Sequence, residues 1–121
     1  MSFLEGLLWL TLNVYHEARS EPQIGQLAVA HVTINRALKQ HKSVKKVVMA
    51  PYQFSWTRQK QAYLPTESTA LMSCIESALK ALVSPDFTHG ATYYHRQDVH
   101  PAWADQMNYV AQYGTHKFYS N

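Results

Sequence analysis

Apolar residues recur at helical spacing in the first third of the chain, in two stretches separated by a polar segment. The first stretch predicts a helix over about residues 3–18, and the second predicts a helix that starts near Ser20. Ser20 is a candidate N-cap, with Gln23 three residues later as in a capping box and Pro22 in the first turn. The apolar positions are Leu4, Leu7, Leu8, Val14 and Ala18 in the first helix, and Ile24, Leu27, Ala28, His31, Ile34 and Leu38 in the second.

The middle of the chain is expected to add two helices. "SVKKVVMAP" fits a short helix that Ser43 caps and that ends before Pro51, and "YQFSW" follows as a loop or short strand. "TESTALMSCIESALKALVSP" has the clearest helical periodicity, with Thr66 as its candidate cap and Cys74 on its apolar face. A buried and unreactive thiol is therefore the expected state of Cys74.

The last third of the chain mixes strand and helix patterns. "GATYYH" predicts a strand, "PAWADQMNYVAQYG" predicts a helix closed by Gly114, and "THKFY" predicts a terminal strand or an extended tail. Gly25, inside the second helix, indicates close approach of another backbone. Together these elements predict an α+β fold that is mostly helical with a small β element, in a single domain spanning residues 1–121.

The composition restricts the functional classes without selecting one. Apolar residues make up 46% of the 121 residues, which is enough for a hydrophobic core, and the formal charge is +3. A mildly basic protein favours an anionic partner. The single cysteine excludes an internal disulfide framework. No zinc-finger or helix-turn-helix pattern is present, so no nucleic-acid partner is expected.

The apolar N-terminus resembles neither an export signal nor a membrane anchor. "MSFLEGLLWLTL" has no basic region, carries Glu5 and is too short to span a bilayer. We therefore expect synthesis in the cytoplasm without a Sec-type signal, and no stable membrane insertion. We also expect the protein to be a monomer.

Glu17 is the first candidate for chemistry. It lies in the polar segment "NVYHEARSEP", in the last turn of the first predicted helix and at the edge of its buried face. Partial burial and the negative end of the helix dipole both raise the pKa of a carboxyl group, as a general acid near neutral pH requires. The alternative is a surface ion pair with Arg19 or with a lysine.

Glu21 is the nearest second carboxylate. In the first turn of the second predicted helix it interacts favourably with the helix dipole, which is a structural role. It can also serve as a partner carboxylate in sugar cleavage, where the separation of the two groups sets the stereochemistry. The sequence leaves both interpretations open.

Aromatic residues with polar neighbours gather in two short segments. Rings that stack on sugar faces, beside groups that bind hydroxyls, suit a carbohydrate groove, whereas core packing is the alternative for each ring. The aromatic residues are Tyr52, Phe54, Trp56, Tyr93, Tyr94 and Trp103, and their polar neighbours are Gln53, Ser55 and His95.

The histidines and lysines give weaker indications. The seven histidines show no HExxH or other metal-binding spacing, so neither a metal nor another cofactor is expected. A basic cluster is either a solvated helix face or a patch that steers the protein to an anionic surface. It contains Arg36, Lys39, His41, Lys42, Lys45 and Lys46.

Five segments, taken in order, are more specific than any one motif. They are "VYHEARSEPQIGQLAVAHVTINR", "QFSW", "GATYYH", "PAW" and "GTHKFY". Together they resemble the cell-wall hydrolase family typified by the catalytic domain of the spore-cortex-lytic enzymes, over nearly the whole chain. The resemblance implies a lysozyme-like domain that cleaves peptidoglycan between N-acetylmuramic acid and N-acetylglucosamine as a lytic transglycosylase. Without a preceding peptidoglycan-binding domain or an export signal, a phage endolysin is the expected member.

The resemblance also implies roles for individual residues. Glu17, in the EAR motif, matches the catalytic glutamate of the family. The family usually has glycine where Ser20 stands. The substrate-binding positions are Gln53, Phe54, Ser55, Tyr94, His95 and Trp103, and His116, Phe118 and Tyr119 also match family positions.

A single carboxylate predicts a reaction without water. Glu17 donates a proton to the glycosidic oxygen, the muramyl C6 hydroxyl captures the oxocarbenium-like centre, and Glu17 then removes that hydroxyl proton. If Glu21 faces the cleft, hydrolysis of the lysozyme type becomes the better hypothesis. The alternatives from other classes are a metal-dependent amidase or peptidase that uses the C-terminal histidines, and a non-catalytic glycan- or nucleic-acid-binding module.

Overall fold

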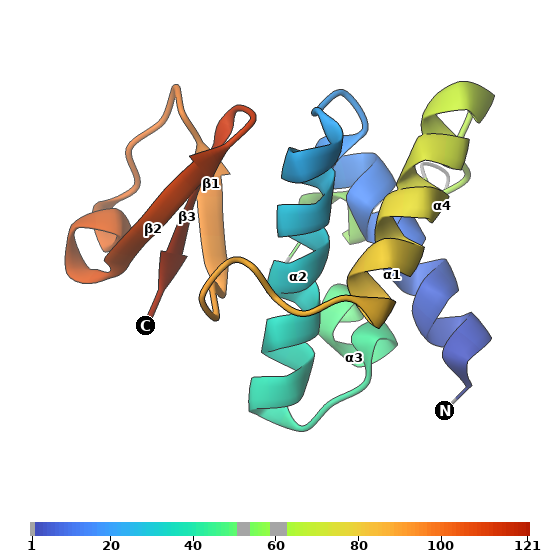
Figure 1. Cartoon of the computed structure of the whole chain (residues 1–121), viewed down its shortest axis with the longest axis horizontal. Helices are drawn as coiled ribbons and strands as arrows, with labels where there is room; N and C mark the ends of the chain where they lie inside the picture. Colours follow the sequence, from blue (N-terminus) through green and yellow to red (C-terminus); the bar gives the residue numbers. More distant parts are fainter. Residues whose placement is uncertain (1, 51–53, 59–62) are drawn as a thin grey trace.

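The computed structural model describes residues 2–50, 54–58 and 63–121 (Figure 1). The fold is α+β and mostly helical, which confirms the predicted class. The helices are α1 (Phe3–Ala18), α2 (Gln23–Gln40), α3 (Val44–Met49) and α4 (Ser68–Val83), with 3-10 turns η1 (Ser55–Arg58) and η3 (Ala102–Gln106). The strands are β1 (Tyr93–Arg96), β2 (Asn108–Tyr113) and β3 (His116–Ser120).

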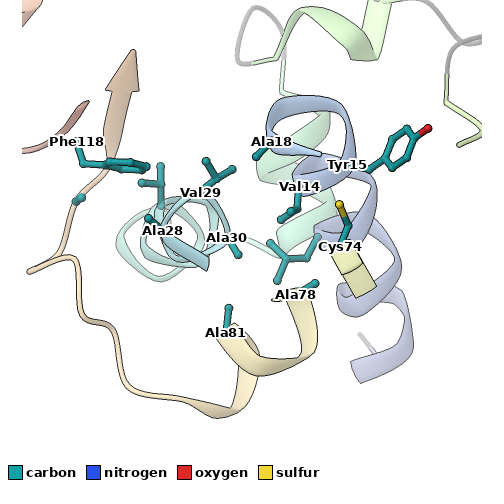
Figure 2. Close-up of a cluster of buried hydrophobic side chains, with 13 residues drawn as sticks. Val14, Tyr15, Ala18, Ala28, Val29, Ala30, Cys74, Ala78, Ala81 and Phe118 are labelled. Carbon is teal, nitrogen blue, oxygen red and sulfur yellow. The ribbon is translucent and has the colours of Figure 1, made fainter. Parts of the chain in front are cut away.

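Helix α2 lies between two layers of the molecule. Helices α1 and α4 pack on one side of it and the sheet on the other (Figure 1). Figure 2 shows the same arrangement in the core, where Phe118 approaches α2 from one side and Val14 and Cys74 lie on the opposite side. Cys74 is fully buried, as predicted.

The predicted apolar stripe of α2 is partly wrong. Ile24 and Leu38 are 45% and 69% exposed, whereas Ala28, Val29 and Val32 are fully buried. A helix that is covered on two sides buries more than one stripe, so Val29 and Val32, which the predicted stripe omitted, are buried together with Ala28, which it included. None of the helices in the described part of the chain is both long enough and apolar enough to cross a membrane.

The three strands are antiparallel in the order β1-β3-β2. Side chains alternate between the two faces of a sheet. Tyr94 and Phe118 are paired across β1 and β3 and face α2, where Phe118 enters the core. Tyr109 and Tyr119 are paired across β2 and β3 on the opposite face, which we call the outer face. The sheet therefore presents one face to the helices, and Trp103 packs on the opposite face, where Tyr119 is buried.

The predicted helix over residues 101–114 is wrong. Only Ala102–Gln106 is helical, as the 3-10 turn η3, and β2 follows it. The segment has aromatic and β-branched residues that suit a strand, and pairing with β3 satisfies its backbone. Gly114 has a φ of 62°, the left-handed conformation that ends a helix but also closes the β2–β3 hairpin.

Helix starts were predicted with mixed success. Ser43 caps α3, since its hydroxyl accepts a hydrogen bond from the Lys46 amide at 3.1 Å. Helix α2 begins one residue after Pro22, so Ser20 does not cap it and Glu21 lies outside the helix. The N-cap position of α4 is Glu67 rather than Thr66.

The prediction for Gly25 is confirmed. A Cβ atom at this position would lie 3.4 Å from the Tyr113 carbonyl oxygen and 3.2 Å from the Glu21 Cβ atom. Glycine therefore lets the end of β2 approach the first turn of α2.

Candidate active site

Glu17 lies in the last turn of α1, and its carboxyl group reaches the sheet. The Tyr94 hydroxyl, on the inner face of β1, donates a 2.6 Å hydrogen bond to Glu17 Oε1. The two residues are 77 positions apart in the chain. Because α2 separates the other helices from most of the sheet, this contact at the end of α1 joins the two layers of the fold.

Burial raises the pKa of Glu17 above its ordinary value. The hydrogen bond from Tyr94 and the positive charge of Arg36 oppose that rise. The pKa of Tyr94 is well above its usual value, because burial and the neighbouring carboxylate both disfavour a phenolate. Tyr94 therefore remains a proton donor to Glu17 through the neutral pH range.

Glu17 faces an open cleft between the end of α1 and the sheet. Two adjoining cavities of about 460 and 200 Å³ share four lining residues, which are His16, Glu17, Arg96 and His116. Tyr94, His95 and Val99 complete the larger cavity, and residues 18–21 complete the smaller one. The cleft is large enough for sugar-sized groups to reach the Glu17 carboxyl.

His16 is a neighbour of Glu17 that the sequence analysis did not select. Its Nε2 is 3.1 Å from the Tyr63 carbonyl oxygen, which can only accept, so Nε2 carries the proton. The ring stacks on Trp56 with centroids 4.4 Å apart. Burial lowers the pKa of His16, and the positive charge of Arg19 lowers it further. The hydrogen bond to the Tyr63 carbonyl oxygen only partly offsets these two effects. A neutral imidazole therefore forms one wall of the cleft beside Glu17.

Glu21 is held by the β2–β3 hairpin. Its Oε1 accepts a 2.7 Å hydrogen bond from the Thr115 amide, and its Oε2 accepts one of 2.7 Å from the Thr115 hydroxyl. His116 Nδ1 lies 3.5 Å from Oε1. Burial alone would raise the pKa of Glu21, but the Thr115 bonds and His116 outweigh it and the pKa is lowered. Glu21 is thus an ionised tether between the α1–α2 turn and the hairpin.

Arg36 was expected in a solvated basic cluster, but it lies partly buried beneath β1. Its Nε donates a 2.6 Å hydrogen bond to the Thr92 carbonyl oxygen. Its guanidinium lies 5.4 Å from the ring centroids of both Phe54 and Tyr93, as in cation–π contacts. This places a fixed positive charge close enough to affect Glu17. No local pattern distinguishes Arg36 from the neighbouring lysines, because only the tertiary fold covers it.

The other predicted substrate-binding residues occupy three different places. Phe54 is buried in a second apolar cluster with Val48 and Trp56, and Ser55 is exposed at the start of η1. Trp103, in η3, packs on the outer face of the sheet. Tyr94 donates a hydrogen bond to Glu17. His95 lines the edge of the cleft, although its ring stacks on Tyr119. Gln53, like Tyr52, lies outside the described residues.

The histidines do not gather into a metal centre. Within residues 2–50, 54–58 and 63–121, no three His, Cys, Asp or Glu side chains are grouped so that they can hold a metal ion. His95 is hydrogen-bonded within the sheet, His100 pairs with Asp105 at 3.1 Å, and His116 faces Glu21. These three histidines therefore have separate local partners.

Comparison with known proteins finds relatives over most of the chain. The spore cortex-lytic enzyme of Halalkalibacterium halodurans is 34% identical over 108 residues, which are 87% of this chain and 32% of the relative. The corresponding enzyme of Bacillus subtilis is 32% identical over 87% of this chain and 34% of its own length. The chain thus spans about a third of the length of these relatives.

Two solved structures share the fold. One is the catalytic domain of the germination-specific lytic transglycosylase SleB from Bacillus anthracis, with a TM-score of 0.82 and 29% identity over 99% of this chain and 97% of that one. The other is the catalytic domain of the Bacillus cereus SleB protein, with a TM-score of 0.79 and 29% identity over 96% and 91% of the two chains. The likeness covers both the helical layer and the sheet.

A family model described as Cell Wall Hydrolase matches residues 20–119. The match includes α2, α4 and all three strands, and it begins just after Glu17. Since it covers well over half of the chain, the protein belongs to the cell wall hydrolase family.

Proposed function

We propose that the protein cleaves the glycan strands of peptidoglycan between N-acetylmuramic acid and N-acetylglucosamine, as a lytic transglycosylase with Glu17 as its acid and base. The proposal rests above all on one contact, the 2.6 Å hydrogen bond that fixes the half-buried Glu17 carboxyl in an open cleft. The names of the relatives, a cortex-lytic enzyme and a lytic transglycosylase, support the substrate and the reaction class.

Because of the Tyr94 contact, the two oxygens of Glu17 have different roles in the proposed reaction. Oε1 accepts from Tyr94, so the acidic proton resides on Oε2. This proton passes to the glycosidic oxygen as the bond from that oxygen to the muramyl C1 breaks. The C6 hydroxyl of the same sugar then bonds to C1, and its proton returns to Glu17. The product is a 1,6-anhydro ring, and no water is consumed.

The surroundings of Glu17 suit both steps. Burial favours the protonated form that must act first as the acid. The Tyr94 hydroxyl and the Arg36 charge favour the carboxylate that remains after proton donation and must act as the base. A pKa raised by burial but restrained by these two groups serves a residue that changes role within one turnover.

Glu21 is the residue that would favour hydrolysis, and its contacts argue against that role. Glu21 lines the smaller cavity, but each of its oxygens accepts a hydrogen bond from Thr115, which holds the carboxylate against the hairpin and makes it a weaker base toward a water. We expect Glu21→Gln to keep activity within about tenfold of wild type, because an amide can still accept from the Thr115 amide group. Glu76→Gln, an exposed change on α4, is the matched control.

Product masses separate the two mechanisms. Mass spectrometry of purified peptidoglycan digested by wild type and by Glu21→Gln should give 1,6-anhydromuramyl ends, lighter than reducing ends by one water. Reducing muramyl ends without the anhydro form would overturn the transglycosylase mechanism. A loss of activity in Glu21→Gln as large as that in a Glu17 variant would restore the two-carboxylate mechanism.

Removal of the Tyr94 hydroxyl should change the pH profile. In Tyr94→Phe the hydrogen bond that lowers the pKa of Glu17 is lost, so that pKa rises. Because the acid form of Glu17 starts the reaction, the alkaline limb of the kcat/KM profile should move to higher pH, with kcat roughly tenfold lower. The profile is measured by product release from purified peptidoglycan. An unmoved or downward-shifted alkaline limb would contradict this role of Tyr94.

Release to the cell wall as a phage endolysin and the monomeric state stay predictions. The identities of the relatives bear on the domain's chemistry and not on these points. Lysis of host cells after co-expression with a membrane-permeabilising protein would test the first, and sedimentation equilibrium the second.

A further inference from the structure

We propose that the outer face of the sheet is a second glycan-binding surface, separate from the cleft at Glu17. Its rings form an aromatic platform made of Tyr93, His95, Trp103, Tyr109 and Tyr119. The proposal rests on the proposed function for the identity of the polymer, and it adds a place where the strand is held without being cleaved.

The five rings pack into one contiguous cluster, in which Tyr119 and His95 are buried and the other three rings are partly or largely exposed. Tyr119 lies at its centre, with ring centroids 5.3 Å from His95, 5.4 Å from Trp103 and 5.6 Å from Tyr109. Trp103 in turn lies 5.2 Å from Tyr93. Tyr93 is 40% exposed and Tyr109 is 56% exposed, and the strand pairing places these two tyrosines on the two sides of Tyr119.

Apart from His95, which also lines the cleft edge, the platform and the cleft lie on opposite faces of the sheet. Tyr94, which holds Glu17, alternates with Tyr93 along β1 and therefore points the other way. Turn η3, which carries Trp103, lies on the far side of the sheet from α2 (Figure 1). A sugar stacked on Tyr109 consequently makes no contact with Glu17, and the two sites bind different parts of a strand.

Hydrogen bonds hold the two buried rings of the platform, His95 and Tyr119, in place. His95 Nδ1 donates to the Arg96 carbonyl oxygen at 2.7 Å, so in the neutral ring Nε2 accepts from the Tyr119 hydroxyl at 2.9 Å. Within the part of the chain that the structure describes, the hydroxyls of Tyr93 and Tyr109 have no such partner. The exposed rings of Tyr93 and Tyr109 pack against this fixed base, and their two hydroxyls remain available to a ligand.

The charges around the platform favour a neutral glycan over other polymers. Lys117 shares the outer face with His95, and Asp105 lies in η3 beside Trp103. The Arg36 guanidinium lies 5.4 Å from the Tyr93 ring. These few charges of mixed sign do not form a row of cations, whereas a nucleic acid needs several cations along its backbone. Hydroxyl-bearing rings also differ from the aliphatic groove that binds a partner helix. They suit sugars, whose C–H faces stack on rings while their hydroxyls bind polar edges.

Binding is tested without cleavage by using the Glu17→Gln protein as the background. We expect the added change Tyr109→Ala to weaken cosedimentation with insoluble peptidoglycan roughly five- to tenfold, because one exposed ring is lost. Tyr109→Phe should retain most of the binding. The matched control is Leu79→Ala, which removes an exposed apolar side chain from α4. Melting curves establish that all variants are folded.

Cleavage gives a second measurement. In the wild-type background, Tyr109→Ala should reduce cleavage of insoluble sacculi at least fivefold more than cleavage of soluble fragments that fill only the cleft. Equal binding by Tyr109→Ala and Leu79→Ala, or an equal loss on both substrates, would overturn the platform. Binding of single-stranded DNA that depends on Tyr109 would also overturn the assignment to glycan. If wild type cleaves neither substrate, the proposed function fails while cosedimentation still decides the platform.

Discussion

Glu17→Gln should lower kcat on purified peptidoglycan by about 10³-fold, because an amide can neither donate the proton to the leaving oxygen nor take one back. The fold should be retained, since the Tyr94 hydroxyl can still donate to the amide oxygen. The loss is measured as release of soluble glycan fragments, with circular dichroism to verify the fold. A folded Glu17→Gln protein that still lyses cell walls would remove Glu17 from the mechanism.

The same variant should not lose stability, which separates catalysis from folding. Burial places the pKa of Glu17 in the folded protein above that in the unfolded chain. The folded state therefore holds the Glu17 proton more tightly, and this contribution to stability is lost as pH rises through the two pKa values. Glutamine does not titrate, so at neutral pH the variant should melt at or above the wild-type temperature. Glu76→Gln is the control for an exposed carboxylate.

Phe118→Ala should lower the free energy of unfolding by about 3–5 kcal/mol, the range for truncating a buried phenylalanine. Phe118 is fully buried between the rings of Tyr94 and Tyr113, at the contact of the sheet with α2. The measurement is urea denaturation. Activity should also fall, because the Tyr94 ring that holds Glu17 loses its neighbour.

A conservative variant checks the cause of that loss. Phe118→Leu keeps most of the apolar volume and should cost clearly less than Phe118→Ala. If Phe118→Ala lowers the unfolding free energy by less than about 1 kcal/mol, the sheet is not held to α2 through this side chain.

The parts of the fold that depend on local pattern were predictable. The helix over residues 3–18 matches α1, and the strands at "GATYYH" and "THKFY" match β1 and β3, because their periodicity and turn residues are encoded nearby. The segment 101–114 failed because its pairing partner lies in another part of the chain. Gly114 fits a helix end and a hairpin equally well, and only pairing with β3 decides between them.

The candidate site shows the same division. Glu17 was selected from its place at the end of an apolar helix, and the structure puts it in a cleft. Its hydrogen bond to Tyr94 spans 77 positions and could not be derived from spacing. Arg36 was missed because its burial depends on β1, which covers it from a distant part of the chain. Trp103 lies on the outer face because the chain after it forms β2 and not the continuation of the predicted helix.

Because Glu17 and Tyr94 come from different layers of the molecule, the proposed activity requires the sheet to be packed against the helices. The proposed acid, Glu17, comes from the helical layer, but the Tyr94 hydroxyl that binds it comes from the sheet. A transient separation of the sheet would therefore silence the enzyme while α1, α2 and α4 remain folded. Local opening at the end of the chain and loss of turnover are then the same event, well before the protein unfolds as a whole.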